Sequence, residues 1–269
     1  MGETVLERVP PPADRRLAYG DGPEQFGDLR LPEGGGPHPC VIAIHGGYWR
    51  NRYSLDHLAH LCAALTGMGI ATWNLEYRRT GDTGGGWTGT FEDVAAGTRF
   101  LFDAADSLSI DLGLVVLLGH SAGGHLASWL GSRDRVPAGS GIEGVAPPVR
   151  GVVSLAGVLD LDAAWSLHLS DDAVVELLGG SPDEVPARYR AASPVRLVPA
   201  GISHLVVHGT ADDVVPLEIS ERYHQAAAEA GQPTSLLRLD GAGHFDLIDP
   251  AARWWPAIAT AIAGMLDLT

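Results

Sequence analysis

A serine between two glycines separates an apolar run from a helical pattern, and this stretch constrains the fold most. The residues of Leu114–Leu118 are all apolar, which is typical of a parallel strand buried on both faces. Gly119, Ser121 and Gly123 follow in a Gly-x-Ser-x-Gly motif. Apolar residues then recur at helical spacing over 126–130. Strand, tight turn and helix in this order predict a nucleophile elbow, a turn that lifts the serine hydroxyl above the sheet.

The rest of the chain alternates between short apolar runs and helical patterns, which predicts an α/β fold with a mostly parallel central sheet flanked by helices. Its 269 residues suit one domain spanning 1–269. Short helical pieces interrupt the alternation at about 157–200, where we expect a small helical cap insertion over the carboxyl ends of the strands. The expected strands are 16–20 and 25–31 (an antiparallel edge hairpin), 40–44, 70–75, 114–118, 149–155, 204–208 and 235–239, and the expected helices are 55–65, 91–105, 160–169, 172–178, 186–192, 217–230 and 250–266.

A nucleophilic serine needs a base within hydrogen-bond reach, and the base needs an orienting carboxylate. The carboxylate should follow a late strand, where Asp212 and Asp213 stand side by side. Successive side chains diverge, so only one of them can face the base. The spacing His-Gly-x-x-Asp-x-x-Val-Pro over 208–216 favours Asp212, and an Asx turn that only shapes the loop is the alternative.

The base is expected in the loop after the last strand. Gly241 and Gly243 precede His244 there, and their backbone freedom allows the imidazole to return over the serine. Nucleophile, acid and histidine in this chain order are typical of the α/β-hydrolase fold. The sequence therefore predicts a catalytic triad of Ser121, Asp212 and His244.

The oxyanion of an acyl-transfer intermediate needs backbone donors. One is expected from Ala122, directly after the nucleophile, and the others from the loop after an early strand. In that loop we predict the N–H groups of Gly47 and Tyr48 as donors, with Gly46 allowing the turn. A plain Gly-Gly turn is the alternative.

Three aromatic residues are candidates for contact with substrate. Trp49 follows the oxyanion loop, Trp165 stands in the expected cap insertion, and Phe245 follows the expected base. Packing is the alternative for each of these large apolar rings.

Charge and composition narrow the choice of partner. A formal net charge of −15 argues against binding to nucleic acid and to anionic membranes, so we expect a small-molecule substrate; a homodimer remains possible as an alternative to a monomer.

Cys40 and Cys62 make no disulfide framework, and the absence of a signal pattern and of a membrane-length apolar run favours the cytoplasm. No spacing fits a zinc site or a phosphate-binding loop, so neither metal nor cofactor is expected.

The loop His45–Trp49, His-Gly-Gly-Tyr-Trp, is similar to the His-Gly-Gly-x-Trp motif of the kynurenine formamidase (arylformamidase) branch of the α/β-hydrolases. That branch neighbours the hormone-sensitive-lipase-like esterases, whose loop reads His-Gly-Gly-Gly. Ser121, Asp212 and His244 fall in the family's order. The resemblance implies hydrolysis of N-formyl-kynurenine to kynurenine and formate, without metal or cofactor.

These patterns predict a serine hydrolase that cleaves a small carboxylic ester or a formamide through an acyl-enzyme. Arylformamidase is the most specific interpretation. A general carboxylesterase of the hormone-sensitive-lipase-like type is the first alternative, and a non-catalytic, ligand-binding relative is a remote one.

Overall fold

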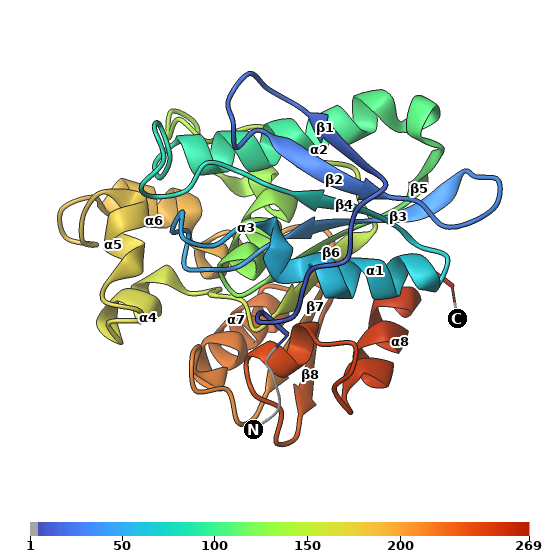
Figure 1. Cartoon of the computed structure of the whole chain (residues 1–269). Helices are drawn as coiled ribbons and strands as arrows, with labels where there is room; N and C mark the ends of the chain where they lie inside the picture. Colours follow the sequence, from blue (N-terminus) through green and yellow to red (C-terminus); the bar gives the residue numbers. More distant parts are fainter. Residues whose placement is uncertain (1–4, 269) are drawn as a thin grey trace.

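The computed structural model describes residues 5–268, and its centre is an eight-stranded sheet (Figure 1). The strand order is β1-β2-β4-β3-β5-β6-β7-β8. Strands β3 to β8 are parallel to one another, and β1 and β2 form an antiparallel hairpin at one edge, as predicted. The strands are β1 (Arg15–Ala18), β2 (Phe26–Arg30), β3 (His38–Ile44), β4 (Ala71–Leu75), β5 (Ile110–His120), β6 (Gly151–Leu155), β7 (Ser203–Gly209) and β8 (Thr234–Leu239).

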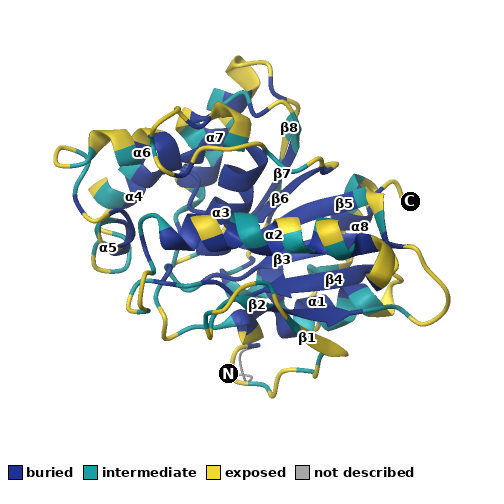
Figure 2. Ribbon diagram, turned by 90° about the horizontal axis from the view of Figure 1, so that it is seen from above, coloured by how far each residue is buried: buried dark blue, intermediate teal, exposed yellow. Residues whose placement is uncertain are grey.

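Helices cover both faces of the sheet and divide the core into two layers (Figures 1 and 2). Side chains alternate along β3: Ile42 and Ile44 pack with α2, α3 and α7, whereas Val41 and Ala43 pack with α1 and α8. The helices are α1 (Ala59–Gly67), α2 (Gly89–Leu108), α3 (Ala122–Gly131), α4 (Leu161–Ser166), α5 (Ala173–Leu178), α6 (Pro186–Ala192), α7 (Leu217–Glu229) and α8 (Trp255–Met265), with 3₁₀ turns η1 (Leu55–Leu58), η2 (Arg133–Arg135), η3 (Pro194–Arg196) and η4 (Phe245–Ile248).

The interval between β6 and β7 contains α4, α5 and α6, close to the helical pieces expected there. In Figure 1 these helices lie together at one end of the sheet. Arg50, shortly after β3, forms an ion pair of 2.8 Å with Glu176 on α5 and donates hydrogen bonds to Ser170. The insertion is therefore bound to the loop at the carboxyl end of β3.

Several predicted boundaries differ from the structure. The expected helix 55–65 is a 3₁₀ turn followed by α1, and the expected helix 250–266 begins only at Trp255. Pro256 stands in the first turn of α8, where a missing N–H costs nothing, so the helix can begin there. Within residues 5–268, no helix combines the length and apolar character needed to cross a bilayer.

Candidate active site

Ser121 occupies a strained turn between β5 and α3. Its backbone has φ 57° and ψ −120°, its side chain is buried, and its N–H donates to the Leu155 carbonyl at 2.8 Å. A Cβ at Gly119 would lie 2.0 Å from the carbonyl oxygen of Gly123. Only glycine fits at 119, because helix and strand backbones meet there. Strained conformations of this kind persist where the surroundings impose them, often at functional sites.

A buried carboxylate–imidazole pair stands on the two loops after β7 and β8. Nδ1 of His244 lies 2.7 Å from Oδ2 of Asp212, and the two side chains are 3% and 0% exposed. The other carboxylate oxygen accepts the backbone N–H groups of Val214 and Val215 at 2.9 and 2.8 Å. Asp213, the competing acid, is exposed. The structure thus brings Asp212, the residue that the spacing favours, to His244.

The charge of Asp212 follows from its partners. Burial alone would raise the pKa of this carboxyl, but the neighbouring imidazoles of His208 and His244 outweigh burial and lower the pKa. Nε2 of His208 donates to the Val215 carbonyl at 2.9 Å and lies 3.3 Å from Oδ2. An ionised carboxylate keeps the proton of His244 on Nδ1, which leaves Nε2 able to accept a proton.

His244 lies next to the elbow. Its ring centroid is 4.5 Å from that of His120, the residue directly before Ser121. Nε2 of His120 is also 3.1 Å from the backbone carbonyl oxygen of His244. The residue predicted as base and the residue predicted as nucleophile therefore meet at the same end of the sheet, although 123 positions separate them in the chain.

The loop after β3 packs directly on the elbow. A Cβ at Gly46 would lie 3.0 Å from Cβ of Ser121, so the loop backbone touches the serine. Gly47 has φ 111°, and Tyr48 has φ 50°, a conformation that non-glycine residues rarely adopt. The hydroxyl of Tyr48 donates to the carbonyl of Val214 at 2.9 Å and so links this loop to the loop of the acid. Within residues 5–268, the N–H groups of Gly47 and Tyr48 bind no protein acceptor, so both can donate to an oxyanion.

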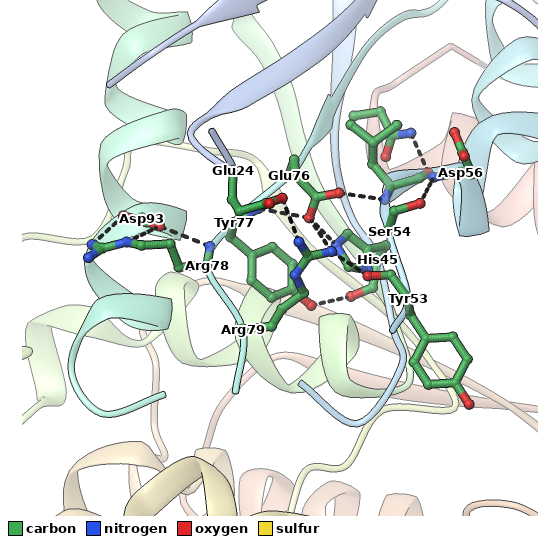
Figure 3. Close-up of polar contacts among 12 residues, drawn as sticks. Glu24, His45, Tyr53, Ser54, Asp56, Glu76, Tyr77, Arg78, Arg79 and Asp93 are labelled. Carbon is green, nitrogen blue, oxygen red and sulfur yellow. Dashed lines mark hydrogen bonds and ion pairs between the residues drawn. The ribbon is translucent and has the colours of Figure 1, made fainter. Parts of the chain in front are cut away.

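An ionic network behind this loop was not predicted from the sequence (Figure 3). Nε2 of His45 lies 2.9 Å from Glu76, whose other carboxylate oxygen accepts the N–H of Leu55 at 3.0 Å. Arg79 forms a further ion pair with Glu76 at 3.0 Å, and Tyr77 stacks on His45 with ring centroids 4.5 Å apart. Burial would raise the pKa of Glu76, but its contacts with His45 and Arg79 and the hydrogen bond from the Leu55 N–H together outweigh burial and lower it. This network holds the start of the loop after β3 in place. The sequence signal for it is the cluster of charged residues at 76–79, directly after a buried strand.

The three aromatic candidates lie in different surroundings. Trp49 is 1% exposed, and its indole N–H donates to Nδ1 of His125 at 3.1 Å, so its ring belongs to the packed interior. Trp165 is half-buried against the core. Phe245 lies edge-on to His244, with ring centroids 5.1 Å apart. The structure shows packing contacts for all three.

A mostly parallel sheet of this order, with a strained serine between strand and helix and an acid and a histidine on the last two strand loops, defines the α/β-hydrolase class. Residues 28–226 match the BD-FAE family, and the chain belongs to this family.

Comparisons with known proteins agree with this class. Esterase LipC of Mycobacterium tuberculosis is 29% identical over 266 residues, which cover 94% of this chain; the chain spans 64% of the length of LipC. Kynurenine formamidase of Danio rerio is 25% identical over 87% of this chain and 75% of its own length. A truncated carbohydrate esterase from gut microbiota superposes with a TM-score of 0.82 at 23% identity, over 95% of this chain and 99% of that one. These similarities extend over most of this chain and agree with its α/β-hydrolase fold.

Proposed function

We propose that this protein is a serine esterase that hydrolyses small carboxylic esters through an acyl-enzyme. One observation carries the proposal: the strained Ser121 directly follows His120, whose ring packs against the His244 of a buried Asp212–His244 pair. The similarity to esterase LipC supports an ester as substrate.

The residues of the site supply each proton and charge that ester hydrolysis requires. Nε2 of His244 takes the proton of the Ser121 hydroxyl as the serine oxygen attacks the ester carbonyl carbon. The N–H groups of Ala122, Gly47 and Tyr48 hold the oxyanion of the tetrahedral intermediate. His244 then gives its proton to the leaving oxygen, which departs as the alcohol.

Water completes the cycle. His244 removes a proton from water as the water oxygen attacks the acyl carbon, and it returns the proton to the serine oxygen when the carboxylic acid leaves. Asp212 stays ionised throughout and stabilises the imidazolium.

Formamide hydrolysis is the second candidate function. It is supported by the His-Gly-Gly-Tyr-Trp loop at His45–Trp49 and by the similarity to a kynurenine formamidase. The same residues would then transfer a formyl group to Ser121, and His244 would protonate the leaving nitrogen, which departs as the arylamine, instead of a leaving oxygen.

Steady-state kinetics distinguish the two functions. We expect kcat/KM for p-nitrophenyl acetate and butyrate to exceed kcat/KM for N-formyl-kynurenine, and we expect Ser121→Ala to abolish turnover of both while the circular dichroism spectrum stays unchanged. The reverse order of kcat/KM would favour the formamidase. Turnover that survives in Ser121→Ala would contradict both.

A further inference from the structure

Three histidines lie in a row behind the elbow. Nε2 of His57, on η1, lies 2.7 Å from Nδ1 of His120, the last residue of β5. Nε2 of His120 lies 3.1 Å from the backbone carbonyl oxygen of His244. All three residues are buried. The proposed mechanism uses the ring of His244 but assigns no role to the other two.

The hydrogen bonds in this row have one direction. A carbonyl oxygen only accepts, so Nε2 of His120 carries a proton and donates a hydrogen bond to the backbone carbonyl of His244. Burial and the neighbouring imidazoles of His244 and His57 lower the pKa of His120 well below its ordinary value, against the opposing effect of Asp212, so the ring is neutral. Its Nδ1 is then bare and accepts from Nε2 of His57.

The ring of His57 is neutral for the same reason. Burial lowers its pKa well below the ordinary value, and the nearby His45 and His244 lower it further. With its proton on Nε2, Nδ1 of His57 is a bare acceptor, and no group in residues 5–268 donates to it. The row therefore begins at His57 and ends at the backbone of the base.

The row also touches the oxyanion loop. A Cβ at Gly46 would lie 3.3 Å from Cε1 of His57 and 2.8 Å from the carbonyl oxygen of His120. Phe245 closes the other side, with its ring centroid 6.1 Å from that of His57 and 6.0 Å from that of His120. The two histidines thus lie where the loops of the nucleophile, the oxyanion donors and the base come together.

We propose that His120 and His57 are positioning residues, whose directed hydrogen bonds hold the backbone of His244 at a set distance from Ser121. The inference rests on the proposed esterase function. Asp212 anchors the ring of His244, and His120 anchors its carbonyl, so the position of Nε2 is determined by two attachments. A displacement of the base by about 1 Å is enough to cost about 100-fold in rate.

The test compares two substitutions at each position. His120→Leu removes the donor to the His244 carbonyl, whereas His120→Gln keeps an N–H group near the place of Nε2. We expect His120→Leu to lower kcat for p-nitrophenyl acetate by about 10- to 100-fold with KM changed by less than about threefold, and His120→Gln to recover most of the loss. At position 57 we expect the same result, with a larger loss of kcat in His57→Leu than in His57→Gln.

His204→Leu is the matched control. His204 is a buried imidazole on β7 that is hydrogen-bonded to the Tyr223 hydroxyl, so its loss should lower the melting temperature and leave kcat unchanged. Wild-type kcat in His120→Leu, or equal losses in the Leu and Gln variants that follow their melting temperatures, would overturn the inference. Should His120→Leu not fold, the His57 pair decides in the same way. Failure of the proposed function looks different, because the wild-type protein itself would then show no ester turnover.

Discussion

Asp212→Asn is the substitution whose effect follows most directly from the geometry. Three donors converge on this carboxylate: the N–H groups of Val214 and Val215 on one oxygen, and the imidazole of His244 on the other. An amide has one acceptor oxygen and cannot serve both sets.

In the Asp212→Asn variant, the amide oxygen can keep the two backbone donors only if the NH₂ group turns toward His244. Nδ1 of His244 must then be bare, so the ring proton moves to Nε2, where it faces Ser121. An imidazole in this tautomer cannot take the serine proton. We therefore expect kcat to fall about 10⁴-fold, or about 5 kcal/mol in activation free energy, with the fold retained.

Asp213→Asn is the matched control for this experiment, because Asp213 is the exposed neighbour of the same loop. Its kcat for p-nitrophenyl acetate should stay within about twofold of wild type. Circular dichroism and thermal melts check that both variants are folded. An Asp212→Asn enzyme that keeps more than about a tenth of the wild-type kcat would refute the reasoning, and so would an Asp213→Asn enzyme whose kcat falls as far as that of Asp212→Asn.

Three further predictions concern the surroundings of the site. Gly119→Ala should prevent soluble expression, because its Cβ would lie 2.0 Å from a backbone oxygen, whereas Gly264→Ala, with open space around it on α8, should leave the melting temperature unchanged or higher. Trp49→Phe leaves the buried Nδ1 of His125 without its hydrogen-bond donor, so urea denaturation should show a loss of about 1–3 kcal/mol in the free energy of unfolding. The KM should stay unchanged, and a large change in KM would instead show that Trp49 contacts the substrate. The pKa of Glu76 in the folded protein lies below the ordinary value of 4.5, so the ionised carboxylate stabilises the fold above that pH and this contribution is lost as pH falls through the folded pKa. Urea midpoints should therefore fall more steeply in acid for wild type than for Glu76→Gln. Parallel curves for the two proteins would contradict this.

The local features of this protein could be predicted from the sequence. The elbow at Ser121 depends on a strand, a turn and a helix within residues 114–130, and each has its own pattern. The spacing favours Asp212 over Asp213, and the structure brings Asp212 to His244. The edge hairpin and the parallel sheet followed from alternating apolar runs in the same way.

Contacts between distant parts of the chain could not be predicted. His57 and His120 are 63 positions apart, and His45 and Glu76 are 31 apart, so no local pattern pairs them. The orientation of the Trp49 ring could not be predicted either, because its hydrogen-bond partner His125 lies 76 positions away in the chain. Such pairs form only when the sheet brings its strand ends together, and that arrangement depends on the packing of the whole core.

The most direct test of the account is the site at which a fluorophosphonate probe reacts. Tandem mass spectrometry of the labelled, digested protein should place a single adduct on Ser121, with no adduct in Ser121→Ala and much slower labelling in His244→Ala. An adduct on another residue, or equal labelling of wild type and Ser121→Ala, would contradict the claim that this serine is the activated nucleophile.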